Sequence, residues 1–111
     1  MNIFEHDENG VTVFELEGRI DTPGAVDMDL ALQAAVADGQ YKMVLDMAKV
    51  RYIGSAGLRT MADVLTKNKD QGGDLKLVAL NRKVERVMRI IGFDKFFSIY
   101  DTLEEAIAAF A

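Results

Sequence analysis

The sequence predicts a small α/β domain, in which a mixed sheet of four to five strands packs with about four helices. Apolar runs of strand length alternate with segments whose apolar residues recur at helical spacing. Capping residues or glycines stand at most of the boundaries between these segments. Strands that alternate with helices favour a partly parallel sheet. A length of 111 residues suits one domain, residues 1–111, with a single core.

The chain opens with a predicted hairpin and a helix. Residues 2–18 predict two short strands that meet at Asn9-Gly10, a dipeptide suited to a tight turn. Thr22 is expected to be the N-cap of the helix, with Pro23 at the first helical position. The apolar face of this helix carries Ala25, Met28, Leu32 and Ala35.

A buried strand and a second helix are expected next. Residues 42–48 (KMVLDMA) are a nearly continuous apolar run, which is typical of a strand covered on both faces. Asp46 interrupts this run, and we expect it near the end of the strand that opens toward Ser55. After residues 54–57 (GSAG), helical spacing resumes, and the apolar face carries Leu58, Met61, Ala62 and Leu65.

The last third of the chain predicts a strand, a helix, a short extended piece and a final helix. Residues 74–80 (DLKLVAL) read as a strand, and Asn81 can cap the helix that follows. Residues 96–100 (FFSIY) are expected to be extended. Thr102 and Glu105 have the spacing of a capping box, and the final helix buries Leu103, Ala106, Ile107 and Phe110.

The composition excludes several classes of function. A net charge of −5 argues against direct nucleic-acid binding and favours a partner with a basic docking face. With no cysteine and one histidine, the chain has no spacing typical of a metal site, and we expect no metal or cofactor. No apolar run approaches membrane-spanning length and no signal peptide is apparent, so we expect a cytoplasmic protein with no membrane contact.

Ser55 is the main candidate for a functional group, because it follows a predicted strand and begins a predicted helix. Functional groups of open α/β sheets collect at such carboxyl ends of strands. A hydrolase would need the pattern G-x-S-x-G, but Ile53 stands two residues before the serine. The only histidine, His6, lies in the first predicted strand, and nothing brings it to Ser55. The chain is therefore expected to be no enzyme.

Two interpretations of Ser55 remain open at this point. A serine at this position can be the N-cap of the helix, typically worth about 1 kcal/mol. The same hydroxyl, flanked by Gly54 and Ala56, is unshielded and within reach of a kinase. A phosphate there would lie at the positive end of the helix, which tolerates it, and would change what can dock on the surface.

Four segments of the chain resemble the STAS domain, and in particular the free-standing anti-sigma factor antagonists of bacteria. They are LEGRID (16–21), VLDMAKVRYIGSAGLRTM (44–61), GGDLKLVALNRKVERVMRIIGF (72–93) and IYDTLEEAI (99–107). The resemblance implies a regulator that binds an anti-sigma factor serine kinase and is released when the kinase phosphorylates it. A PP2C-type phosphatase reverses the modification in that family. The resemblance covers nearly the whole chain, and the free protein is expected to be a monomer.

The resemblance also implies the residues of the site. Ser55, two residues before Gly57-Leu58, matches the phosphoacceptor, and Asp21 matches the acidic residue of the kinase-facing surface. The implied partner-binding residues are Asp21, Thr22, Gly54, Ala56, Gly57, Leu58 and Arg59. Gly54 departs from the family, which usually has Asp or Ser there. This departure keeps one alternative open, a STAS scaffold that is never phosphorylated or a subunit of a signalling or lipid-transport complex.

Overall fold

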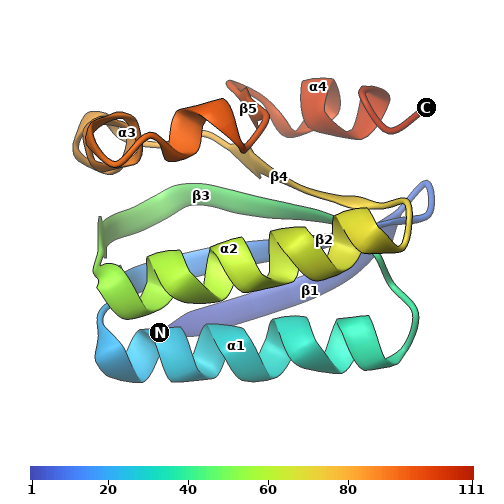
Figure 1. The fold of residues 1–111 in the computed structure, drawn as a ribbon, viewed down its shortest axis with the longest axis horizontal. Helices are drawn as coiled ribbons and strands as arrows, with labels where there is room; N and C mark the ends of the chain where they lie inside the picture. The colour runs from blue at the N-terminus through green and yellow to red at the C-terminus, as the bar shows by residue number, and fades with distance from the viewer.

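The computed structural model describes residues 1–111 as a five-stranded mixed sheet with helices on both faces (Figure 1). The strands lie in chain order, and only the first pair is antiparallel. The strands are β1 (Asn2–Glu8), β2 (Val11–Ile20), β3 (Lys42–Ile53), β4 (Asp74–Val78) and β5 (Ile99–Tyr100). The helices are α1 (Thr22–Ala37), α2 (Ser55–Asp70), α3 (Arg82–Ile90), the 3₁₀ turn η1 (Phe93–Lys95) and α4 (Leu103–Ala108). The predicted fold class is confirmed.

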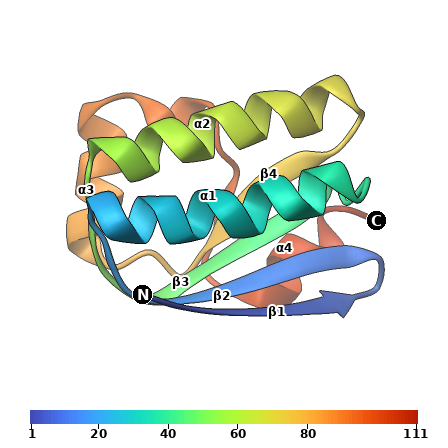
Figure 2. The same ribbon diagram turned by 90° about the horizontal axis from the view of Figure 1, so that it is seen from below.

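Two helices, α1 and α2, cover one face of the sheet, and both views show them side by side and running in the same direction (Figures 1 and 2). They are parallel because each follows one of two parallel strands, β2 and β3. Between them and the sheet lies the main core, to which α3 adds Val84 and Met88. The predicted inner face of α1 is confirmed, since Ala25, Met28, Leu32 and Ala35 are all buried.

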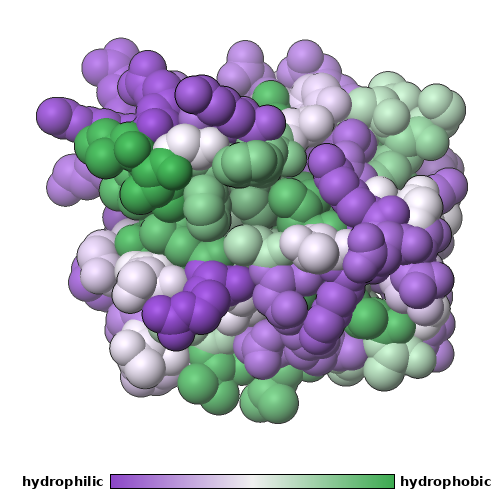
Figure 3. Space-filling model, viewed as in Figure 1, coloured by the Kyte–Doolittle hydropathy of each residue, from purple (hydrophilic) through white to green (hydrophobic).

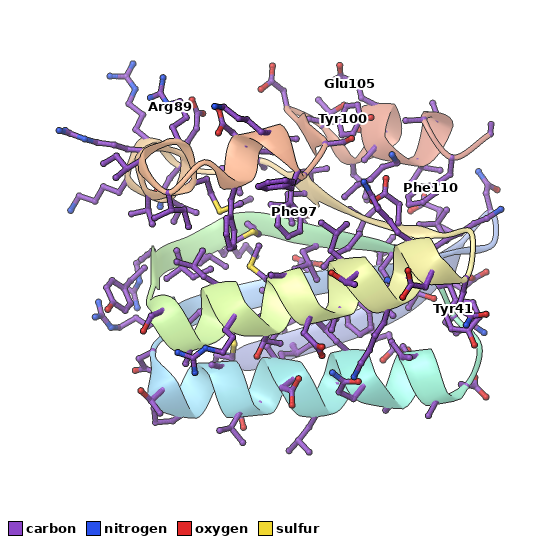
Figure 4. The ribbon with its side chains drawn as sticks, viewed as in Figure 1. Tyr41, Arg89, Phe97, Tyr100, Glu105 and Phe110 are labelled. Carbon is purple, nitrogen blue, oxygen red and sulfur yellow. The ribbon has the colours of Figure 1, made fainter.

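The opposite face of the sheet carries a smaller core under α4, formed by Val11, Val13, Val44, Val78 and Ala106. Lys76, which is largely buried on β4, donates a hydrogen bond to Asp74 Oδ2 at 3.0 Å. Its ammonium nitrogen lies 5.7 Å from the ring centroid of Tyr100 and 4.8 Å from that of Phe110 (Figure 4). This cation therefore ties the C-terminal segment to the sheet.

The second inner strand is longer than predicted. β3 continues beyond residue 48 to Ile53, because its backbone stays paired with β2 although Ala48, Lys49, Arg51 and Tyr52 are exposed. Asp46 consequently lies within the strand, and the expectation that it stands near the end was wrong. Ile20 of β2 pairs with Ile53, so the two strands end together, immediately before α1 and α2.

Cap predictions succeeded at α3 and α4 and failed at α1. The side chains of Asn81 and Thr102 accept hydrogen bonds from Val84 N and Glu105 N, as predicted. At α1 the N-cap is Asp21, whose Oδ1 accepts from Gly24 N at 2.9 Å. Thr22 is the first helical residue, because the chain is still extended at Asp21 and turns helical after it.

Two further expectations were only partly right. In α2, Met61 and Leu65 are buried as predicted, but Leu58 and Ala62 are only half-buried. Val64 and Asn68, which were not predicted to face the core, are buried as well. The buried stripe is rotated because α2 packs against α1 as well as the sheet. In the segment 96–100, only Ile99–Tyr100 is a strand. The final helix buries Ala106 fully and Leu103 and Ile107 in part, whereas Phe110, also half-buried, lies beyond the end of the helix at Ala108.

Candidate functional site

Ser55 is the first residue of α2 and is exposed. The N-cap is Gly54, whose backbone is extended (φ −102°, ψ 177°) and whose carbonyl oxygen accepts the hydrogen bond from Leu58 N at 3.1 Å. Of the two interpretations of Ser55, the N-cap interpretation is therefore wrong by one residue. Its hydroxyl has no hydrogen-bond partner in the chain, so it stands free at the start of the helix.

The turn that presents Ser55 is held tightly to the sheet. Gly54 N donates to the carbonyl oxygen of Ile20 at 2.9 Å, which fixes the end of β3 to the end of β2. Gly57 is buried, and a Cβ atom there would overlap Ile20 Cγ2. Only glycine permits this approach of α2 to the sheet. Ser55 thus sits on a rigid support rather than on a mobile loop.

Gly54 also leaves room for an aromatic side chain. A Cβ atom at this position would lie 3.1 Å from the hydroxyl oxygen of Tyr52, closer than ordinary van der Waals contact. The Tyr52 ring is partly exposed and stacks under Arg19, whose guanidinium carbon lies 4.4 Å from the ring centroid. The residue that departs from the family pattern is therefore coupled to an Arg19–Tyr52 pair. The pair is not evident from the sequence, because only the parallel register of β2 and β3 brings the two residues opposite each other.

A groove between α1 and α2 opens beside Ser55. Its lining residues are Thr22, Ala25, Val26, Asp29 and Leu30 of α1, and Ala56, Arg59, Thr60 and Asp63 of α2. Val26 and Leu30 are large apolar side chains with exposed fractions of 56% and 67%. Figure 3 shows hydrophobic surface protruding at its lower edge, where α1 runs in Figure 1. The sequence pattern did not single out these two residues, because α1 is apolar on several sides and periodicity alone does not separate its exposed side from its buried side.

The predicted site residues come together at one end of the sheet. The turn from Gly54 to Leu58 lies beside Asp21 and Thr22, because β2 and β3 are parallel and end in register. Thr22 and Arg59 are exposed, whereas Gly57 is buried and Leu58 packs partly against the core. Asp21 is half-buried, and its carboxylate is engaged in capping α1.

The charge of this end differs from the charge of the whole chain. Arg19 lies one residue before the end of β2, Arg51 lies two residues before the end of β3, and Arg59 lies one turn into α2. The helix α3 follows β4 and is fastened to the same end by Asn81 Nδ2, which donates to Val50 O at 2.8 Å. Figure 3 shows strongly hydrophilic surface over α3, and Arg89 points outward from it (Figure 4). Every arginine of the chain lies at this end, namely Arg19, Arg51, Arg59, Arg82, Arg86 and Arg89.

The structure brings no catalytic group to Ser55. His6 lies on the edge strand β1 opposite Val13, which pairs with Val44 near the beginning of β3, whereas Ser55 follows the end of β3. The nearest acidic partner of His6 is Glu8, at 3.3 Å. No three acidic or histidine side chains converge as a metal site would require.

The sequence profile of the STAS domain matches residues 5–106. The anti-sigma-F factor antagonist RsfB of Mycobacterium tuberculosis is 33% identical over 101 residues, which cover 91% of this chain and 82% of RsfB. The crystal structure of an anti-sigma factor antagonist from Mycobacterium paratuberculosis is 32% identical, with a TM-score of 0.89, and the match covers 97% of this chain and 92% of that one.

A more distant solved structure shares the fold alone. It is the Bacillus cell fate determinant SpoIIAA, which is 15% identical to this chain. The TM-score is 0.76 against its unphosphorylated form, where 97% of this chain and 96% of SpoIIAA are covered. It is 0.78 against its phosphorylated form, where 99% and 100% are covered. No helix in the present structure combines the length and the apolar character needed to traverse a bilayer.

Proposed function

The chain belongs to the STAS domain family, and from this membership we propose that it is an anti-sigma factor antagonist. In this proposal the unphosphorylated protein binds an anti-sigma factor that is also a serine kinase, and this binding frees the sigma factor. Phosphorylation of Ser55 then releases the kinase, and a PP2C-type phosphatase restores the first state. The protein itself catalyses nothing, and it acts in the cytoplasm, where ATP and the transcription machinery are found.

The observation that carries the proposal is the free hydroxyl of Ser55. It is exposed, it caps nothing, and its neighbours Gly54 and Ala56 have no side chain that would shield it. The kinase would transfer the γ-phosphoryl group of ATP to Ser55 Oγ. The bond from phosphorus to the bridging oxygen breaks, ADP leaves, and a base of the kinase takes the hydroxyl proton. The phosphatase would add a water oxygen to phosphorus and break the bond from phosphorus to Ser55 Oγ. Inorganic phosphate then leaves, and a proton returns to the serine oxygen.

Phosphorylation at this position leaves the fold intact. The first turn of α2 contains no acidic residue that would repel the phosphate, and the positive end of the helix favours an anion. Because the Ser55 hydroxyl makes no hydrogen bond within the chain, its modification costs no side-chain hydrogen bond of the fold. The phosphate therefore acts on the docking surface rather than on stability, as a partner switch requires.

The decisive experiment uses the two serines of the chain. We expect one of the anti-sigma serine kinases of its own genome to add a single phosphate from ATP, detected by mass spectrometry. Ser55→Ala should abolish the addition, whereas Ser98→Ala, which removes another exposed serine, should leave it unchanged. Ser55→Asp should bind that kinase at least about tenfold more weakly, about 1.4 kcal/mol. Phosphate that survives Ser55→Ala would overturn the assignment.

One observation keeps a second function in view. Gly54 stands where the family usually has an acidic residue or a serine before the phosphoacceptor. The Tyr52 hydroxyl lies beside it, in space that a side chain at position 54 would need. A STAS scaffold that works without phosphorylation would bind its partner equally well as wild type, Ser55→Ala and Ser55→Asp. Equal affinity of the three proteins would favour the scaffold, and a selective loss for Ser55→Asp would exclude it.

A further inference from the structure

The surface around Ser55 carries positive charge that no carboxylate of the chain neutralises. Arg19, Arg51 and Arg59 are exposed and form no ion pair. In α3 only Arg89 has a partner, Glu85, at 3.8 Å. The chain as a whole is acidic, with a net charge of −5, so the unpaired arginines are a local reversal of its overall charge.

Nearby acidic side chains are engaged elsewhere. Asp21 caps α1, and Glu17 lies 3.8 Å from the ammonium nitrogen of Lys49. Asp63, farther along α2, pairs with Lys67 at 3.1 Å. Asp29 accepts a hydrogen bond from Gln33 Nε2 at 3.2 Å. The arginines beside Ser55 are thus available to a group that comes from outside the chain.

Two of these arginines are well placed relative to Ser55. Arg19 is held by stacking on the Tyr52 ring, and the hydroxyl of that ring rests against Gly54, the residue before Ser55. Arg59 stands four residues after Ser55 in the same helix, and residues at this spacing are neighbours on one face. A phosphate on Ser55 would therefore lie next to the Arg59 side chain.

We propose that this arginine end docks an acidic face of the partner, and that the phosphate on Ser55 ends the docking by occupying the same arginines from within the chain. The proposal rests on the proposed function, whose switch it explains. A phosphate of about −1.5 to −2 charges forms strong, charge-assisted hydrogen bonds with a guanidinium group. Carboxylates of the partner then lose their counter-charges and face a new negative group.

The occupant is an acidic protein surface rather than a nucleic acid. The exposed apolar side chains Val26 and Leu30 line the groove beside the arginines, and apolar contacts of this kind suit a protein partner. The proposal therefore differs from the expectation, drawn from net charge alone, of a partner with a basic face.

The first test needs no partner. The protein is prepared with phosphoserine encoded at position 55, and the phosphate is titrated by ³¹P NMR. Contact with Arg59 should place the midpoint below the value of about 6 for an isolated phosphoserine, and Arg59→Gln should raise it. Lys69→Gln, which removes an exposed cation from the last turn of α2, is the matched control and should leave the midpoint unchanged. Equal midpoints in wild type and Arg59→Gln would overturn the proposal.

The second test uses the kinase identified by Ser55 phosphorylation. Arg19→Glu and Arg59→Glu should each weaken its binding to the unphosphorylated protein at least tenfold, while Lys69→Glu should not. Circular dichroism checks that each variant is folded. Unchanged affinity in both variants would refute the proposal that the partner docks through an acidic face, but it would not contradict the proposed function. If no kinase phosphorylated Ser55, the proposed function itself would be refuted. Binding of a labelled oligonucleotide that is lost in Arg59→Glu would assign the surface to nucleic acid instead.

Discussion

At the scale of single residues, three positions define the end of the sheet that presents Ser55. Gly57 permits α2 to touch Ile20, and a larger residue would push the helix away from β2. Gly54 provides the cap through its backbone and the space for Tyr52. Ser55 itself has no structural task. A residue without a structural task can be modified without cost to the fold, which is the property a switch needs.

The identity of the α1 cap gives a prediction at this scale. Asp21→Ala should lower the free energy of unfolding by about 1 kcal/mol, because Gly24 N loses the carboxylate that accepts its hydrogen bond. Thr22→Ala should change it by less than about 0.5 kcal/mol, because Thr22 is exposed and caps nothing. Urea unfolding, monitored by circular dichroism, measures the free energy of unfolding of both variants. The opposite ranking would mean that Thr22, as the sequence predicted, is the cap.

At the scale of elements, the helices on the two faces of the sheet have different roles. The paired helices α1 and α2 contribute seven of the twenty buried residues of the main core and also line the groove beside Ser55. The short helix α4 covers the other face over a much smaller core. Because α4 has only six residues, it depends on tertiary contacts rather than on its own helical propensity.

The contact between Lys76 and Phe110 should therefore govern the stability of α4. We expect Phe110→Ala to speed hydrogen exchange of the amides in residues 103–108 several-fold, because α4 loses apolar contact and a cation–π interaction worth about 0.5–1 kcal/mol. Amides of α2 should exchange as in the wild type, since Phe110 packs against the smaller core under α4, whereas α2 packs against the main core. Ile90→Ala, at an exposed position in α3, is the control. Faster exchange throughout the chain would refute a local role.

At the scale of the whole molecule, the arrangement of charge matters more than its sum. Cations from β2, β3, α2 and α3 meet at one end because parallel strands bring their carboxyl ends together. At an ionic strength of 0.15 M, charges farther apart than about 8 Å are largely screened. A docked partner therefore interacts with the arginine end and hardly with the net charge of −5.

Salt should accordingly weaken the complex with the kinase. Between 0.15 M and 0.5 M NaCl we expect the Kd to rise about tenfold, because ion pairs at the docking surface are screened. The double variant Arg19→Glu/Arg59→Glu should show a much flatter dependence. Isothermal titration calorimetry at several salt concentrations gives these values. An affinity that rises with salt would show that the partner face is basic.

Much of this organisation could be predicted from local sequence. The order of strands and helices, the inner face of α1 and the caps at Asn81 and Thr102 depend on periodicity and on residues a few positions apart. The place of Ser55 at the end of a strand was also evident. Such features need only short-range interactions, which a short stretch of sequence contains in full.

The tertiary structure decided the features that depend on strand register and helix packing. It chose Asp21 over Thr22 and Gly54 over Ser55 as caps, because the end of each strand sets where the next helix begins. It also placed Arg19 on Tyr52, two residues separated by a whole helix and a strand. Sequence alone therefore determined the fold class and the position of the hydroxyl. Only long-range pairing of parallel strands determined the charge around it, since this pairing alone brings distant residues to one surface.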